Sequence, residues 1–168
     1  MIRKPLTTFS DDRVYRYTLW REWDILFVSE PRFVNFICLN PSTATEILDD
    51  PTIRRCMRFS KRWGYDGMCI TNIFAYRATK PVNMMVQEDP IGPDNDNWLR
   101  QVASDADLII AAWSGHAGFK DRSTEVRTLL RELGKPVHYL RMGEGINPEP
   151  WHPLYLPNST MPTLWVTV

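Results

Sequence analysis

The chain has 168 residues, of which 43% are hydrophobic and 24% are charged. These values predict a single soluble domain over residues 1–168, large enough to bury a core without disulfide staples. Its 20 basic and 20 acidic residues balance, which argues against indiscriminate binding to polyanions but is compatible with a local basic patch.

The cysteine pattern and the hydropathy predict a cytoplasmic protein. Cys38, Cys56 and Cys69 form no CxxC pair, so we expect reduced and mostly buried thiols. No stretch approaches the roughly 18 apolar residues of a membrane span, and the first residues lack the apolar segment of a signal peptide. We therefore expect no membrane partner. The sequence carries no indication of the oligomeric state.

The N-terminal part of the chain has the patterns of β-strands. Residues 14–20 alternate in the manner of a strand, and residues 24–30 follow a short turn, which predicts an N-terminal hairpin over about 14–30. The next run, 32–39, is rich in apolar, β-favouring residues and predicts a strand inside a sheet.

A helix is predicted from Pro51 to Gly64. Asp50 is a good N-cap, proline suits the first helical position, and glycine commonly ends a helix. Apolar residues recur on one face, and the other faces carry a basic run: Arg54, Arg55, Arg58, Lys61 and Arg62. This run is either a solvated helix face or a phosphate contact. Arg77 and Lys80 are better placed for a phosphate near the strand ends.

Strands and helices alternate along the rest of the chain. The predicted order is strand 67–75, loop 76–93, helix 94–105, strand 107–113, helix 123–133, strand 136–141 and a loop-rich tail from 142. This order predicts βαβ units in an α/β core over about 32–157. We expect a three-layer αβα domain with a central, mainly parallel sheet. In such folds ligands bind beyond the carboxyl ends of the strands.

The candidate site residues lie at or near the ends of three of the predicted strands, where a parallel sheet would gather them at one edge. They are Asn40, Pro41, Ser42 and Thr43, then Asn72, then Trp113, Ser114 and His116, with His152 in the tail. An asparagine amide matches the edge of a nucleobase or holds a water, and a histidine donates to an oxygen that gains negative charge. Each also has an ordinary structural explanation: a turn starter, a buried amide, a packing histidine.

The motifs of metal and cofactor chemistry are absent from the sequence. His138 lies in an apolar strand pattern, and the acidic pairs near 49–50 and 94–96 have no third partner at a defined spacing. The chain has no P-loop, no GxGxxG and no GxSxG. We therefore expect no metal and no cofactor.

Several segments together resemble the family catalogued as domain of unknown function 1643. They are CLNPSTAT, DDPTIRRC, WGYDG, TNIFAYRAT, DPIGPDND, AAWSGHAG and HPLYL. The resemblance covers nearly the whole chain beyond the first dozen residues, and it names a family without naming an activity.

The order of motifs is also similar, more distantly, to that of the uracil-DNA glycosylase superfamily. The resemblance implies a fold of that type, with Asn40 positioning the attacking water and Asn72 reading the pyrimidine edge. The segment WSGHA at 113–117 looks like the superfamily's WGSHA-like segment, and His152 would stabilise the base oxygen as the glycosidic bond breaks. The first motif lacks a Gly before Asn40 and a Tyr after Pro41, which implies a weaker or specialised activity.

The functional expectation is a nucleobase N-glycosidase that acts on a base in DNA or in a nucleotide. Leu154, Tyr155 and Leu156 are candidate wedge residues for flipping a base out of a duplex. Two alternatives remain open: a module that binds a nucleotide or modified base in the same pocket without cleaving it, and a structural protein that kept only the fold.

Overall fold

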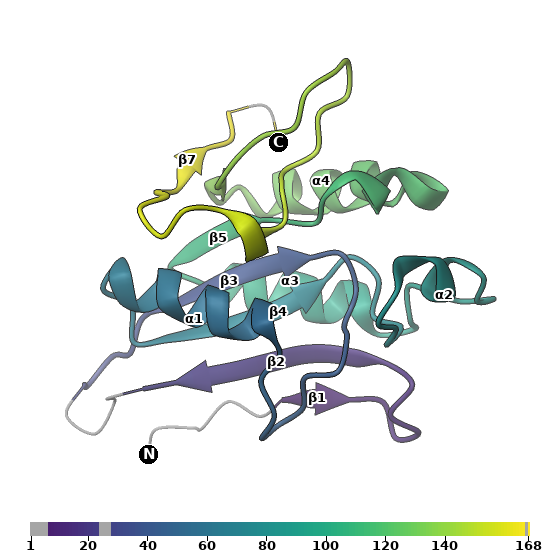
Figure 1. Cartoon of the computed structure of the whole chain (residues 1–168), viewed down its shortest axis with the longest axis horizontal. Coiled ribbons are helices and arrows are strands. Elements are labelled where there is room, and N and C mark those ends of the chain that lie inside the picture. Colours follow the sequence, from purple (N-terminus) through teal and green to yellow (C-terminus); the bar gives the residue numbers. More distant parts are fainter. Residues whose placement is uncertain (1–6, 24–27, 167) are drawn as a thin grey trace.

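A seven-stranded sheet forms the centre of the computed structural model, which describes residues 7–23, 28–166 and 168. The strand order is β1-β2-β4-β3-β5-β6-β7. The strands are β1 (Thr8–Phe9), β2 (Arg16–Glu22), β3 (Phe33–Cys38), β4 (Gly67–Asn72), β5 (Leu108–Ala111), β6 (Val137–Tyr139) and β7 (Thr163–Leu164). The four central strands are parallel, whereas β2 and β7 pair antiparallel with them, as Figure 1 shows. The predicted α/β class and the mainly parallel centre are confirmed.

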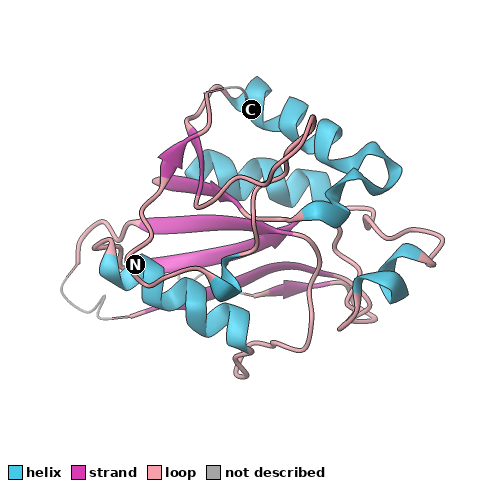
Figure 2. Ribbon diagram, turned by 45° about the horizontal axis from the view of Figure 1, so that its top comes forward, coloured by secondary structure: helices cyan, strands magenta, loops and turns pink. Residues whose placement is uncertain are grey.

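Helices cover both faces of the sheet. The helices are α1 (Pro51–Arg62), α2 (Pro81–Met85), α3 (Asn95–Asp105) and α4 (Arg122–Leu133), with 3-10 segments η2 (Gly115–Asp121) and η3 (Pro153–Tyr155). In Figures 1 and 2, α1 lies on one face of the sheet, and α3 and α4 lie on the other. Strand β3 serves both layers because its side chains alternate: Phe36 packs in the cluster that contains Phe59 of α1, and Ile37 packs in the cluster that contains Leu99 of α3.

Helix α1 begins as the sequence predicts. The Asp50 carboxylate accepts a hydrogen bond from the Ile53 N–H (2.9 Å), and Pro51 takes the first helical position. Gly64 follows the helix with a φ of +79°, a conformation that glycine adopts without strain. An N-cap such as Asp50 contributes about 1 kcal/mol. It fixes the amino end of α1 beside the carboxyl ends of β3 and β4.

The first strand of the predicted N-terminal hairpin is present as β2, and its observed partners lie outside the predicted hairpin. Strand β2 pairs with β1 and, through Leu19 opposite Ile70, with β4. Of the second predicted strand, residues 24–27 lie outside the described residues, and residues 28–30 form no strand. Long-range pairing prevails because Leu19 is fully buried in the cluster that contains Ile70, so β2 gains a hydrophobic face that a local hairpin would not provide.

Three smaller features also differ from the sequence-based expectation. Strand β4 ends at Asn72 rather than at residue 75, the expected loop 76–93 contains α2, and the tail contains β7. Helix α2 starts at Pro81, where proline's fixed φ suits a first helical position. Strand β7 pairs at the sheet edge. It is only two residues long, which is too short to produce a periodic signal in the sequence.

The strand order places a topological switch point between β3 and β5. The chain leaves β3 through α1 to reach β4 on one side, and it leaves β4 through α3 to reach β5 on the other side. Ligands in open α/β sheets commonly bind outside the carboxyl ends of the strands at such a point; the largest group of candidate residues lies one strand away, at the ends of β3 and β4. Within the described part of the chain, no helix is both long and apolar enough to cross a membrane.

Candidate functional site

A cavity of about 390 Å³ lies at the carboxyl ends of β3 and β4, beside the amino end of α1. We call it the main cavity. Asn40, Asn72 and His152 all line it, although they come from three separate parts of the chain. The other polar lining residues are Arg16, Ser42, Thr43, Asp50, Thr52 and Thr79. Its volume falls within the range of about 300–1,000 Å³ that small-molecule sites occupy.

The amide of Asn40 is held in one orientation. Its Nδ2 donates to the backbone carbonyls of Pro41 (3.1 Å) and Ala78 (2.8 Å). Because carbonyls only accept, both contacts require the NH₂ group, and Oδ1 is left as an acceptor. Ala78 in turn donates its N–H to the Pro41 carbonyl (2.9 Å). The amide therefore joins the loops after β3 and β4 and retains an oxygen that can orient a water.

Asn72 presents an unsatisfied acceptor at the end of β4. The side chain is 2% exposed, and its Oδ1 is buried without a hydrogen-bond partner among the described residues. The backbone carbonyl of the same residue accepts from Asn95 Nδ2 (2.9 Å), so its main chain is held in place. A buried acceptor without a partner costs about 1–3 kcal/mol. The Oδ1 atoms of Asn35 and Asn95 are also buried without a partner among the described residues, but of these three asparagines Asn72 alone lines the main cavity.

His152 presents a hydrogen-bond donor. Its Nδ1 accepts a hydrogen bond from the Leu154 N–H (3.3 Å), so the neutral ring carries its proton on Nε2. Burial lowers the pKa of His152 below its usual value, while the charge of Asp50 opposes this shift. The imidazole is therefore neutral at pH 7, with an N–H group available at the Nε2 position.

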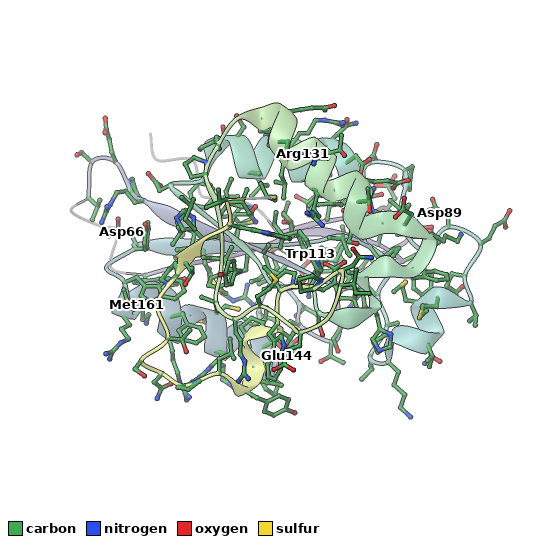
Figure 3. The ribbon with its side chains drawn as sticks, turned by 90° about the horizontal axis from the view of Figure 1, so that it is seen from above. Asp66, Asp89, Trp113, Arg131, Glu144 and Met161 are labelled. Carbon is green, nitrogen blue, oxygen red and sulfur yellow. The ribbon has the colours of Figure 1, made fainter. Side chains whose placement is uncertain are left out.

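The segment that carries His152 is anchored to the end of β5. The Trp113 indole N–H donates to Glu149 Oε2 (2.6 Å), and the Ser114 N–H donates to the Pro150 carbonyl (2.8 Å). Trp113 is fully buried; Figure 3 labels it near the middle of the molecule. Trp113 does not line the main cavity. Its observed contacts therefore position the tail and do not reach a ligand.

A second hollow of about 570 Å³ lies on the other side of His152, which lines both. Ser114 lines this second hollow together with Glu144 and Glu149. His116 is exposed and lines neither of the two. The structure therefore places Ser114 next to the main cavity and His116 apart from it.

A third hollow of about 420 Å³ adjoins the main cavity through shared walls at Ser42, Thr43, Ala78 and Thr79. Arg77 lines it, and the Arg77 Nε is buried without a partner among the described residues. Pro41 is buried and lines none of these three cavities.

The basic run of α1 lines none of the three cavities, and neither does Lys80. Of the candidate wedge residues, Leu156 is buried, Leu154 lines the main cavity and Tyr155 is 90% exposed beside the second hollow.

Arg16 was not predicted as a site residue. It is 2% exposed and lines the main cavity. Its Nη1 donates to the Ala44 carbonyl (3.0 Å), and its Nε has no partner in the described part of the chain. Burial lowers the pKa of Arg16 to about 10, so the guanidinium is still charged at neutral pH. An arginine in an alternating strand pattern suggests a solvent-facing position, and only the three-dimensional structure reveals its burial.

The cysteines are free and buried. Cys38 lines the main cavity, but burial raises its pKa to about 12. A thiol nucleophile needs an accessible thiolate, so Cys38 acts as an apolar wall. In the part of the chain that the structure describes, no group of three or more His, Cys, Asp or Glu residues is arranged to hold a metal ion.

The fold and the main cavity define an α/β protein with a ligand-sized cavity at the carboxyl edge of a parallel sheet. The chain matches the family described as "Protein of unknown function (DUF1643)" over residues 16–154, and it belongs to that family. No curated protein and no solved structure matches the chain significantly.

Proposed function

We propose that this protein is a nucleobase N-glycosidase that acts on a base in DNA or in a nucleotide. The observation that carries the proposal is the convergence of Asn40, Asn72 and His152 on one cavity of about 390 Å³. Each offers a different group: a fixed amide oxygen, a buried unpartnered acceptor and an imidazole N–H. The similarity of motif order to the uracil-DNA glycosylase superfamily supports the same proposal as a resemblance between sequence motifs.

The reaction is hydrolysis of the bond between the anomeric carbon and a base nitrogen. The electron pair of that bond leaves with the base, and His152 Nε2–H donates to the base oxygen on which the negative charge collects. Asn72 accepts a hydrogen bond from an N–H on the base edge. These two groups bind the departing base, and both are held by backbone contacts that precede the reaction.

Water completes the reaction at the anomeric carbon. Asn40 Oδ1 orients the water, but an amide is too weak a base to keep its proton. Asp50 is the one carboxylate among the described lining residues, and we assign to it the uptake of this proton. The released base then takes a proton at the nitrogen that held the sugar, which balances the hydrolysis.

A second candidate function is binding without cleavage. It is favoured by the two carbonyl contacts of Asn40 (2.8 and 3.1 Å), because an amide committed to joining two loops also has a purely structural use. In that case the main cavity would hold a nucleotide or a modified base and release no product.

Base release measured by mass spectrometry tests the proposal. The substrates are single-stranded and duplex DNA with uracil or modified bases, and the matching nucleotides. His152→Asn keeps an acceptor for the Leu154 N–H but cannot reach the position of Nε2, and Asn suits the cap of η3. We expect wild type to release base and His152→Asn to lose at least about 100-fold in rate, the range of one lost transition-state donor.

His116→Asn is the matched control, because the same substitution falls on an exposed residue outside the main cavity. It should release base at the wild-type rate. Equal rates for wild type and His152→Asn would remove His152 from the chemistry. If wild type releases no base from any substrate, yet a nucleotide raises its melting temperature, the binding function replaces the glycosidase.

A further inference from the structure

We infer that Arg16 is the phosphate-binding residue of the main cavity, so that the substrate is a free nucleoside monophosphate instead of a polymer. The inference rests on the proposed function, because it names the substrate class of the same site. Its starting point is a cation that is 2% exposed, lines the cavity and has no carboxylate partner among the described residues.

Arg122, the second buried arginine among the described residues, provides a comparison, because its charge is balanced inside the protein. Arg122 is 1% exposed, and its guanidinium pairs with both Asp96 and Glu125 and donates Nε to the Ile73 carbonyl (2.8 Å). Arg16 has one neutral acceptor, the Ala44 carbonyl, and an unpartnered Nε. A buried charge without a counter-ion is strongly unfavourable. The missing counter-ion points to an anionic ligand.

The groups around Arg16 suit a phosphate. The wall between the main cavity and the third hollow carries the hydroxyl residues Ser42, Thr43 and Thr79. Beyond that wall lies Arg77, which also has a buried, unpartnered Nε and whose charge adds to that of Arg16. Guanidinium groups bind phosphate oxygens through two parallel N–H donors, and hydroxyl groups supplement them.

The carboxylate of Asp50 faces the same cavity and attracts the Arg16 cation. It forms no ion pair with Arg16, because none of the ion pairs of the described residues includes either group. Its Oδ1 accepts the Ile53 N–H (2.9 Å) at the start of α1. Asp50 therefore leaves the Arg16 Nε without a partner among the described residues.

The location of Arg16 favours a small substrate. When an enzyme flips a base out of DNA, the base enters the pocket and the phosphates remain along the protein surface. Arg16 instead lies buried in the same cavity as the base-reading Asn72. Both the base and the anion of the ligand must then fit within about 390 Å³. The net charge of zero also gives no general attraction for a polymer of phosphates.

The inferred reaction consumes one water and one nucleoside monophosphate. Water forms a bond to the anomeric carbon, and the bond from that carbon to the base nitrogen breaks with its electrons on the base. The water loses one proton, and the base gains one. The products are a free base and a pentose 5-phosphate, and no oxidant or reductant is required.

Calorimetric titration of the wild-type protein tests the inference directly. The probes are the common ribo- and deoxyribonucleoside 5′-monophosphates, the matching nucleosides, inorganic phosphate, acetate and a single-stranded oligonucleotide. We expect one monophosphate to bind about 10- to 100-fold more tightly than its nucleoside, the effect of hydrogen bonds to a charged group. Equal affinity for nucleoside and monophosphate would overturn the inference, and this comparison needs no variant.

Two variants add a matched comparison. Arg16→Met keeps an unbranched chain of similar length without the charge, and it should lose the preference for the monophosphate. It removes a buried charge together with the donor to the Ala44 carbonyl, so its unliganded melting temperature should fall less than that of Arg122→Met, which loses two ion pairs. Arg122→Met should melt at a lower temperature and keep the preference. Retention of the preference for the monophosphate in Arg16→Met would overturn the inference. If that variant does not fold, Arg16→Lys replaces it. We expect a weaker preference in Arg16→Lys, because the lysine ammonium lacks the planar, forked set of N–H donors of a guanidinium.

The remaining probes separate this inference from the proposed function. If inorganic phosphate binds as tightly as any nucleotide, or if acetate competes equally, the site takes a simple anion and the nucleotide is ruled out. If the oligonucleotide binds most tightly and loses its base, the result supports the glycosidase function and refutes the small substrate. If a monophosphate binds through Arg16 but mass spectrometry detects no free base, the result supports the phosphate site and refutes the glycosidase function.

Discussion

Replacing Asn72 with leucine should make the unliganded protein more stable. The two side chains have similar shapes, and Asn72 Oδ1 has no partner among the described residues. Removing an unsatisfied buried acceptor recovers about 1–3 kcal/mol. For a domain of this size, each kcal/mol corresponds to about 2–4 °C in melting temperature. We therefore expect Asn72→Leu to melt several degrees above wild type and to lose its response to any nucleotide or base.

Two other buried asparagines provide matched controls. Asn95 Nδ2 donates to the carbonyls of Asn72 (2.9 Å) and Ile73 (3.1 Å), and Asn35 Nδ2 donates to Thr71 Oγ1 (3.0 Å). Leucine at either position removes donors that buried acceptors need, so both variants should melt below wild type. All three asparagines have a buried Oδ1 without a partner among the described residues. They differ in Nδ2, which donates to buried acceptors in Asn35 and Asn95, whereas Asn72 lines the main cavity.

Differential scanning calorimetry of the three variants, with and without ligand, measures both effects. A melting temperature of Asn72→Leu as low as that of Asn95→Leu would refute the reasoning, because it would show that the Asn72 amide supports the fold. A stabilised Asn72→Leu that still binds the ligand would show that the unpartnered oxygen is not what the ligand recognises. The reasoning requires the gain in stability and the loss of binding together.

Three further predictions concern other charged and polar groups of the protein. Asp50→Asn keeps a good N-cap for α1 but removes the charge, so we expect an unchanged melting temperature and a loss of base release, whereas Asp50→Ala should also lose about 1 kcal/mol of folding free energy. Burial lowers the pKa of His138 and of His152, so as the pH falls the unfolded chain takes up protons at a higher pH than the folded chain does. The urea midpoint of unfolding should therefore fall as the pH drops below about 6.5, and it should fall less in His152→Asn. Trp113→Phe removes the donor to Glu149 and should cost about 1 kcal/mol in urea unfolding and slow base release; an unchanged rate would show that this contact does not position His152.

The sequence predicts those parts of the fold whose signals are local. The run 33–38 is apolar and favours a strand, and Asp50-Pro51 is a capping signal, so β3 and α1 were predicted close to their observed bounds. Strand β2 could not be paired correctly, because its partner β4 lies about fifty residues away and the pairing depends on the burial of Leu19 against Ile70. Long-range contacts of this kind leave no periodic trace in either segment.

The same division applies to the candidate site. Asn40 and Asn72 were predicted because each follows or ends an apolar run, and parallel strands bring such positions together. Arg16 was missed because its significance lies in a contact that does not form: no carboxylate of the described residues pairs with it. The roles of Trp113 and His116 also required the structure, which buries one and exposes the other.

The unsatisfied groups of the main cavity have opposite polarity, and this combination restricts the ligand more than either group does. The Arg16 Nε is a donor with a positive charge, and the Asn72 Oδ1 is a neutral acceptor. A ligand that satisfies both must carry an anion at one end and an N–H or O–H donor at the other. Inorganic phosphate carries its charge and its O–H donors on one small group and a nucleoside lacks the anion, whereas a nucleoside monophosphate whose base edge bears an N–H supplies both at separate ends. The two unpartnered atoms therefore favour a nucleoside monophosphate, a substrate with which the proposed roles of Asn40 and His152 are also consistent.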